Sequence, residues 1–194
     1  IDFAYHCSPD SMISWFDKSL MEKVYFNFLS NAFKNVPDGG TVEVNLHAES
    51  LQTIKDQYPK QAAAYSDNEI SYFVLEIKDS GKGIAESELE NIFIPFYQVA
   101  QNEHSASGTG LGLSLSKSII EMHHGVIWAE SPVGSGAVFI CILPICKQCF
   151  NENAFIEAVT ETTDFQDAIE AVTEIEENPI NQEKKHTIMG VADS

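Results

Sequence analysis

Three groups of residues, met in order along the chain, have types and spacings that suit a nucleotide with its metal ion. The first group is Asn27, Asn31 and Lys34, whose spacing of four and then three residues places them on one face of a helix. Two carboxamide oxygens and one ammonium group on that face can meet Mg²⁺ and phosphate, because Mg²⁺ prefers oxygen ligands. Asn and Lys on an exposed helix face are more often simply solvated, so this group carries weight only together with the others.

The second group is the sequence DSGKG, residues 79–83, which follows a predicted strand. The Asp79 carboxylate at the end of that strand can accept a hydrogen bond from an exocyclic amine such as that of adenine. Gly81 and Gly83 let a ligand come close to the backbone, because glycine has no side chain. An ordinary turn after a strand explains the same segment about equally well.

The third group is the sequence GTGLGL, residues 108–113, which opens a predicted helix. Backbone N–H groups at a helix N-terminus favour phosphate, and glycines let the phosphate approach them. A glycine-rich stretch by itself is weak evidence. This one matches neither the GxxxxGK[ST] phosphate loop nor the dinucleotide fingerprint that follows a strand directly.

Apolar periodicity predicts the elements that position these groups. Asp17 is the predicted N-cap of the first long helix, whose apolar residues form one stripe. The second long helix is predicted to end at Gly125 in a left-handed cap. The polar stretch 49–68 is interpreted as a long excursion, partly helical at most. The predicted strands are residues 1–7, 12–16, 41–47, 70–78, 126–130 and 137–143, and the predicted helices are residues 18–35, 87–92 and 110–124.

The combination of motifs is far more specific than any one of them. Asn-x3-Asn-x2-Lys, then DxGxG, then IFIPFY at residues 92–97, then GTGLGL, in this order, resembles the sensor histidine kinases. These kinases belong to the wider superfamily of gyrase, chaperone, histidine kinase and MutL ATPases. The resemblance covers about residues 1–144, including the GSG at 134–136. It implies an α+β fold of the Bergerat type, a two-layer α/β sandwich in which a mixed sheet packs against three main helices.

The resemblance also implies a role for each motif residue. Asn31 would bind Mg²⁺ with Asn27 nearby, Lys34 would contact phosphate, and these three would be the catalytic residues. Asp79 would hold the adenine amino group, and residues 98–109 would form a lid over ATP. The remaining nucleotide-contacting positions would be Asn35, Gly81, Gly83, Ile84, Phe93, Phe96, Tyr97, Gly108, Thr109, Gly110, Leu111, Gly112 and Leu113.

One position favours phosphoryl transfer over ATP hydrolysis. The hydrolysing relatives carry a Glu four residues before the metal-binding Asn, and this chain has Asn27 there. A carboxamide is not a base near neutral pH, so it cannot activate water. The acceptor would be a His on a dimerisation domain that this chain lacks, for relay to a response regulator. His123 and His124 lie about 20 Å away along the second long helix and are interpreted as its C-terminal residues.

Two other functions stay open at this stage. Asn35 stands where many of these kinases carry an aromatic residue, and the chain has no Arg. These departures leave room for a regulatory module that binds nucleotide weakly. A hydrolysing ATPase is the second alternative, against which Asn27 and the acidic charge speak.

Charge and composition exclude several classes of function. The formal net charge is −18, so the chain lacks the basic face that binding to nucleic acid requires. No apolar run approaches the roughly 20 residues that span a bilayer. Cys146 and Cys149 have CxxC spacing, but no further ligands for zinc follow, and reduced thiols are expected.

The chain is predicted to contain one catalytic domain and the start of a tail. Residues 1–146 are the ATP-binding domain, and residues 147–186 are an acidic linker, helical or disordered. Residues 187–194, TIMGVADS, resemble the first strand of a response-regulator receiver domain. We therefore expect this chain to be the cytoplasmic part of a membrane-anchored bacterial hybrid sensor. We expect the chain by itself to be a monomer.

Overall fold

The computed structural model describes residues 1–9, 14–66, 70–99 and 109–149. These residues belong to one compact unit, Ile1–Glu152, and the second unit, Asn153–Ser194, lies outside them. The predictions for most of the linker, for the receiver-like segment and for most of the lid therefore concern residues outside the described part.

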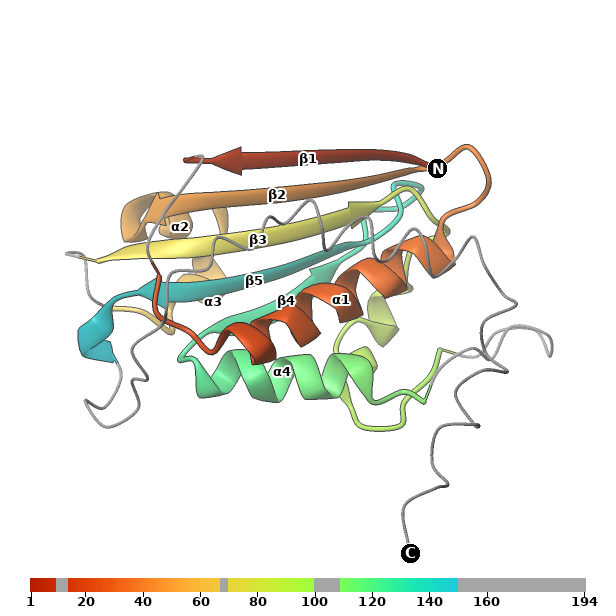
Figure 1. Ribbon diagram of the computed structural model, residues 1–194. Helices are drawn as coiled ribbons and strands as arrows, with labels where there is room; N and C mark the ends of the chain where they lie inside the picture. Colours follow the sequence, from red (N-terminus) through yellow and green to blue (C-terminus); the bar gives the residue numbers. More distant parts are fainter. Residues whose placement is uncertain (10–13, 67–69, 100–108, 150–194) are drawn as a thin grey trace, which may run out of the picture. The chain divides into compact units, whose positions relative to one another are not determined.

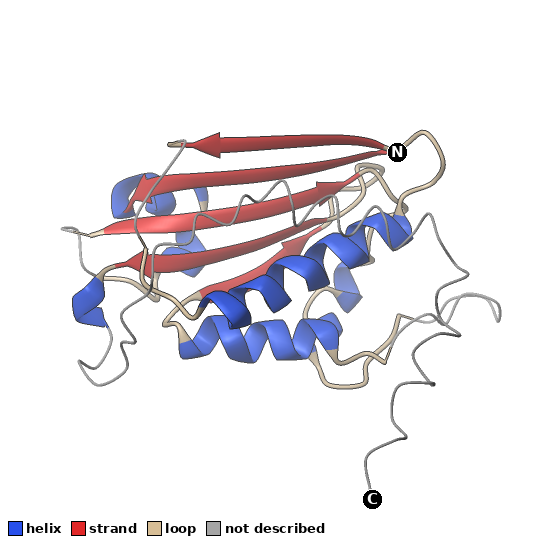
Figure 2. Ribbon diagram, viewed as in Figure 1, coloured by secondary structure: helices blue, strands red, loops and turns tan. Residues whose placement is uncertain are grey.

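A five-stranded mixed sheet forms the centre of the domain (Figures 1 and 2). Its strands lie in the order β1-β2-β3-β5-β4. Strands β1 and β2 run parallel, and every other neighbouring pair is antiparallel. This mixed sheet with helices is the predicted α+β class. The strands are β1 (Asp2–Ser8), β2 (Thr41–Ser50), β3 (Ser71–Asp79), β4 (Val126–Glu130) and β5 (Val138–Ile145).

Two long helices, α1 (Lys18–Asn35) and α4 (Gly112–Met122), cover one face of the sheet (Figure 1). Helix α1 begins as predicted, because the Asp17 carboxylate accepts a hydrogen bond of 3.0 Å from the Leu20 N–H. Its apolar stripe is fully buried at Val24, Phe28 and Ala32. Burying a large side chain of this kind contributes about 1.5–3 kcal/mol, so this stripe fixes α1 against the sheet.

The other face of the sheet is partly covered by α2 (Leu51–Gln57) and α3 (Pro59–Ala62). This corrects the interpretation of residues 49–68 as mostly irregular. Strand β2 continues to Ser50, whose hydroxyl caps α2 by accepting a hydrogen bond from the Thr53 N–H. The cluster beneath these helices contains Leu51, Ile54, Ala62, Tyr72, Val74, Ile140 and Ile142.

Several predicted boundaries differ from the structure. The described part of the predicted strand 12–16, residues 14–16, is not a strand. The predicted helix 87–92 is two 3-10 turns, η1 (Glu86–Glu88) and η2 (Asn91–Phe93). Helix α4 begins two residues later than predicted, and its left-handed cap is His124, with φ 59°, rather than Gly125.

The C-terminal end of the described part also differs. Strand β5 runs to Ile145 and includes Pro144. A 3-10 turn, η3 (Lys147–Cys149), follows, and Cys146 and Cys149 are joined as a disulfide, against the expectation of reduced thiols. None of the helices in the described residues combines the length and apolarity that crossing a bilayer requires.

Candidate functional site

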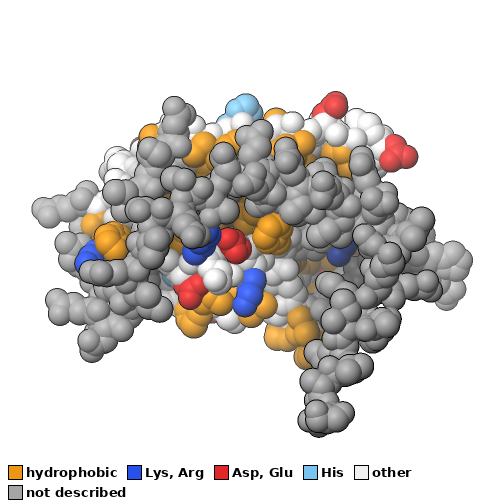
Figure 3. All heavy atoms as spheres, viewed as in Figure 1, with side chains coloured by type: hydrophobic (Ala, Val, Ile, Leu, Met, Phe, Trp, Pro, Cys, Tyr) orange, Lys and Arg blue, Asp and Glu red, His pale blue; other side chains and the backbone are white. Residues whose placement is uncertain are grey.

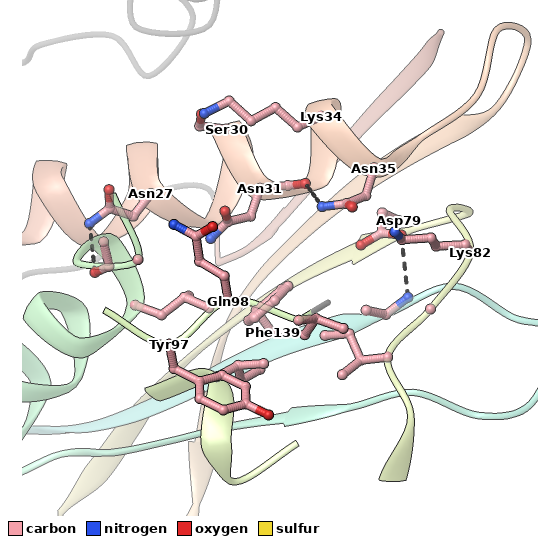
Figure 4. Close-up of a pocket in the computed structure, with 18 of the residues that line it drawn as sticks. Asn27, Ser30, Asn31, Lys34, Asn35, Asp79, Lys82, Tyr97, Gln98 and Phe139 are labelled. Carbon is pink, nitrogen blue, oxygen red and sulfur yellow. Dashed lines mark hydrogen bonds between the residues drawn. The ribbon is translucent and has the colours of Figure 1, made fainter. Parts of the chain in front are cut away.

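A cavity of about 820 Å³ opens between α1, the start of α4 and the ends of β3 and β5. Most of the residues predicted to bind nucleotide line it (Figure 4). The predicted residues in its lining are Asn27, Asn31, Lys34, Asn35, Asp79, Gly83, Ile84, Tyr97, Thr109, Gly110, Gly112 and Leu113. The structure therefore brings the three motif groups, which are far apart in sequence, to one place.

Of the predicted residues that the structure describes, four stand outside the lining. Gly81 contributes its N–H to Asp79 rather than a surface. Phe93 is buried in the core and anchors η2. Phe96 and Leu111 are exposed, so they flank the cavity instead of lining it. Gly108 lies outside the described residues.

The residues that sequence reasoning missed come mainly from distant elements. Ile92 and Phe139 add apolar surface to the cavity, and Ala137 donates its N–H toward Asp79. Lys82 lies inside the DSGKG motif, so its position could have been noticed there. Ser30 is the other missed lining residue, whereas Gln98 and Val99 of the lining belong to the predicted lid.

Asp79 is built as a buried acceptor. Its side chain ends β3 and the residue is only 3% exposed. Carboxylate Oδ1 accepts hydrogen bonds from the N–H groups of Gly81, at 2.8 Å, and Ala137, at 3.3 Å. Burial raises the pKa of Asp79, and the two N–H bonds act in the opposite direction. Because both bonds fall on Oδ1, Oδ2 is available to a donor on a ligand.

Backbone packing around Asp79 explains the glycines nearby. Gly136 has φ +74°, and a side chain there would overlap the Asp79 carbonyl. The Ser131 hydroxyl accepts from the Ile84 N–H at 2.8 Å and donates to the Gly136 carbonyl at 2.7 Å. Ser131 thus joins the DSGKG turn to the GSG turn, and both turns form one rigid wall beside the carboxylate.

Charges inside the cavity suit an anion although the chain is acidic. Among the described residues of the lining, the charged ones are Lys34, Lys82 and Asp79, which together carry one net positive charge. In Figure 4, Lys34 extends along α1 toward Ser30, and Lys82 lies beside Asp79. The two lysine side chains therefore lie in different parts of the view, Lys34 beside Ser30 and Lys82 beside Asp79.

The start of α4 leaves its backbone donors to a ligand. No side chain caps this helix within the described residues, because Leu111 occupies the cap position. Gly110 precedes it with φ +70°, and a Cβ there would lie 2.8 Å from the Phe96 backbone. N–H groups at an uncapped helix N-terminus bind phosphate oxygens well.

The ends of the lid are joined at this same point. The Phe96 N–H donates to the Gly110 carbonyl at 2.9 Å, and Phe96 has φ 65°. The Tyr97 hydroxyl donates to the Glu88 carboxylate, which ties the chain to η1. Phe93 therefore anchors the core side of this segment, and the Phe96 backbone closes the loop.

The donor set also decides how a metal ion could be held. The described residues contain no group of three or more His, Cys, Asp or Glu placed to bind a metal. A Mg²⁺ ion beside α1 would be held by amide oxygen, phosphate and water, because Mg²⁺ prefers oxygen ligands and usually keeps several waters. Asn31 fits that role, since its side chain points into the cavity in Figure 4.

Comparison with known families covers most of the domain. The sequence model of the family described as "Histidine kinase-, DNA gyrase B-, and HSP90-like ATPase" matches residues 16–147. Sensor histidine kinase TmoS of Ectopseudomonas mendocina is 34% identical over 138 residues, which are 71% of this chain and 12% of TmoS. Adaptive-response sensory kinase SasA of Synechococcus sp. (strain JA-3-3Ab) is 32% identical over 133 residues, or 69% of this chain and 30% of SasA.

A third relative aligns with almost the whole chain. Histidine kinase P4 of Formosa agariphila is 25% identical over 202 residues, which are 98% of this chain and 13% of that protein. This chain thus spans at most 30% of the length of these three relatives.

Solved structures agree with the fold. The catalytic domain of histidine kinase ThkA has a TM-score of 0.55 at 26% identity, covering 74% of this chain and 80% of the ThkA chain. The mycobacterial sensor histidine kinase MprB has a TM-score of 0.53 at 26% identity, with 74% and 80% of the two chains covered.

Proposed function

We propose that this chain is the ATP-binding catalytic domain of a two-component sensor histidine kinase. The chain belongs to the histidine kinase-, DNA gyrase B- and HSP90-like ATPase family. The observation that carries this proposal is the convergence of Asn31, Asp79 and the uncapped start of α4 on one cavity. The named relatives TmoS, SasA and P4 are all kinases of this type, which supports the same function.

The residues divide the nucleotide between two ends of the cavity. Asp79 Oδ2 accepts a hydrogen bond from the adenine amino group, while Ile92 and Phe139 supply apolar surface for the base. The backbone N–H groups at the start of α4 bind phosphate, with Lys34 as a nearby point charge. Asn31 holds Mg²⁺ through its amide oxygen. When bound, ATP supplies the γ-phosphoryl group that is transferred.

The chain's own residues favour transfer to a protein acceptor over transfer to water. A general base would have to reach the phosphate end of the cavity, and Asn27 there cannot accept a proton near neutral pH. Asp79, the one carboxylate in the described lining, belongs to the base-binding end. Catalysis by this domain then consists of positioning the reacting groups and stabilising charge.

The two adjacent histidines of the domain are poor acceptors. His123 is buried, its Nε2 accepts from the Asp17 N–H at 2.9 Å, and its Nδ1 bonds the Ile119 carbonyl at 2.7 Å. Both ring nitrogens are therefore engaged in structure, at the end of α4 opposite the glycine turn. His124 holds the left-handed cap of α4. In the proposed function, the acceptor histidine lies on a dimerisation domain of the longer parent protein.

Exposed apolar residues beside the cavity offer a docking face for that acceptor domain. Leu111, Leu115 and Met122 recur along one side of α4, and Leu115 is 48% exposed. Phe96 adds to this side, since its N–H bonds the Gly110 carbonyl next to Leu111. In the space-filling view, hydrophobic side chains are visible along the outer side of the helices (Figure 3). A helical acceptor domain could cover this surface while presenting its His to the cavity.

The tail suggests a fused receiver domain. Residues 187–194 resemble the first strand of a receiver, and the alignment with histidine kinase P4 covers 98% of this chain. The resemblance of residues 187–194 supports a hybrid sensor in which a response-regulator receiver follows the kinase. The parent would be a bacterial, membrane-anchored sensor with this domain in the cytoplasm.

A phosphoryl-transfer assay on the longer parent protein tests the function. Incubation with ATP labelled at the γ-phosphate should put acid-labile label on a histidine, and Asn31→Ala should abolish it. Leu115→Glu should lower transfer but leave nucleotide affinity unchanged, because Leu115 is outside the cavity lining. Steady release of labelled phosphate without protein labelling would favour a hydrolase, and binding without either reaction would favour a regulatory module.

A further inference from the structure

A small polar network joins α1 to the first turn of α4. The Asn27 amide nitrogen Nδ2 donates to the Gly112 carbonyl at 3.0 Å and to the Ser116 hydroxyl at 3.1 Å. The Ser116 hydroxyl in turn donates to the same Gly112 carbonyl at 3.0 Å. Figure 4 shows the Asn27 side chain directed at α4 rather than along α1 toward Asn31.

This network uses the hydrogen-bonding capacity of its members efficiently. Both hydrogens of the Asn27 amide have an acceptor, and Ser116 is completely buried with its hydroxyl both donating and accepting. A Cβ added to Gly112 would lie 3.0 Å from Asn27 Oδ1, so the amide packs tightly against that glycine. A buried hydroxyl or carbonyl that loses such partners costs about 1–3 kcal/mol.

We propose that Asn27 and Ser116 are positioning residues that hold the glycine turn of α4 in register with Asn31. This inference rests on the proposed function, because the object being positioned is the Mg²⁺–phosphate group. Asn31 follows Asn27 by one helical turn, about 6 Å along α1. A metal on Asn31 and phosphates on the start of α4 can be bound together only if the two helices keep a fixed offset. Asn27 then serves as a clamp and not as a second metal ligand.

Ser116 makes the inference separable from metal binding. It is buried and does not line the cavity, so it cannot touch the nucleotide or the ion. Any effect of Ser116 on phosphate binding must pass through Gly112 or Asn27. Adenine is held at the other end of the cavity by Asp79, so the clamp should not affect it.

Calorimetric titration of this chain with adenosine, ADP and ADP plus Mg²⁺ tests the clamp. Ser116→Ala and Asn27→Asp should each weaken ADP about tenfold, equally with and without Mg²⁺, and leave adenosine unchanged. Asn31→Ala should instead remove the gain in affinity that Mg²⁺ provides. The double variant should be no weaker than the more damaged single variant, because the residues act as one unit.

Asn27→Asp discriminates most sharply, since a carboxylate is a better Mg²⁺ ligand but cannot donate to the Gly112 carbonyl. Asn91→Asp is the matched control, because Asn91 Nδ2 also donates to a backbone carbonyl, that of Ser87, outside the cavity lining. Melting temperatures show whether each variant folds, and Ser116→Ala carries the test if Asn27→Asp does not. Unchanged or tighter Mg²⁺–ADP binding by Asn27→Asp, or an unaffected Ser116→Ala, overturns the clamp. A wild-type chain that binds no nucleotide overturns the proposed function as well.

Discussion

Helices α1 and α4 lie side by side on one face of the sheet, but their N-terminal ends are built differently (Figure 1). At the start of α1, the Asp17 carboxylate accepts a backbone N–H of the first turn. At the start of α4, the cap position is Leu111, and no described side chain takes that part. A helix N-terminus that serves only the fold has its first-turn N–H groups satisfied by the protein, whereas an N-terminus that binds an anion leaves those donors to the ligand.

The same contrast separates the two oxygens of Asp79. Oδ1 accepts two hydrogen bonds from backbone N–H groups, whereas no described residue donates to Oδ2 of this cavity-lining carboxylate. In both places the protein satisfies the groups that stabilise its fold and leaves particular groups for a ligand. The following substitutions test that division, beginning with the largest expected effect.

Gly110→Ala should damage the start of α4 most severely. The residue needs φ +70°, and an added Cβ would lie within 2.9 Å of the Phe96 backbone, so the turn must change shape. Strain of about 1–3 kcal/mol, equivalent to roughly five- to 150-fold in ADP affinity, is expected. Gly134→Ala is the matched control, with φ +76° but no atom within 4 Å of the new Cβ. Equal losses of ADP affinity in both variants would contradict a specific role for Gly110.

Asp17→Ala should change stability and leave the ligand unaffected. Losing the cap bond to Leu20 costs about 1 kcal/mol, measurable by urea denaturation. Nucleotide affinity should stay at the wild-type value, because Asp17 caps the N-terminus of α1, and the cavity is lined by the C-terminal half of that helix. Asp38 is an exposed acid in the turn after α1, so Asp38→Ala should change neither the unfolding free energy nor the nucleotide affinity. A loss of nucleotide affinity in Asp17→Ala would contradict the assignment of a purely structural role to the N-terminus of α1.

Asp79→Asn should stabilise the ligand-free chain at neutral pH. Burial raises the pKa of Asp79, so the folded chain binds this proton more tightly than the unfolded chain does. Wild-type stability contributed by this group is therefore present at low pH and is lost as the pH rises through the raised pKa. The variant has no such loss, and its amide oxygen can keep both bonds from Gly81 and Ala137. Denaturation at several pH values should show the advantage above that pKa and none in acid; an advantage that grows in acid would contradict it.

His124→Gly should give the smallest change, at the opposite end of α4. His124 has φ 59°, a backbone conformation that costs most residues energy and glycine almost none. We expect a net gain in unfolding free energy of about 0.5–1 kcal/mol, because the relief of backbone strain exceeds the cost of the freedom that glycine adds to the unfolded chain. A thermal melt measures it, and a destabilised variant would show that the imidazole itself supports the cap.

Sequence reasoning succeeded where the determinants are local. Helix α1 has the predicted bounds because Asp17 and the apolar stripe along its 18 residues define it without help from the rest of the chain. Residues of all three motifs line one cavity, because DSGKG ends β3, GTGLGL opens α4, and the Asn27, Asn31 and Lys34 group shares one face of α1. The identities of the residues at the site were therefore largely available from the sequence.

Long-range packing decided what could not be predicted. Helices α2 and α3 are too short to show a clear periodicity, and they are held by contacts such as the Tyr58 ring against Trp128. Phe139 reaches the cavity from β5, which no motif marks. The direction of the Asn27 amide depends on where α4 lies, so spacing along α1 alone could not separate a clamp from a metal ligand.

The central claim is that Asp79 Oδ2 and the start of α4 hold opposite ends of one adenine nucleotide. The most direct measurement is calorimetric titration of this chain and Asp79→Asn with ADP and a non-hydrolysable ATP analogue, each with Mg²⁺. The account predicts that the wild type binds both and that Asp79→Asn, folded and at least as stable at neutral pH, binds neither measurably. Binding by Asp79→Asn with wild-type affinity, or no binding by the wild type at millimolar nucleotide, would contradict it.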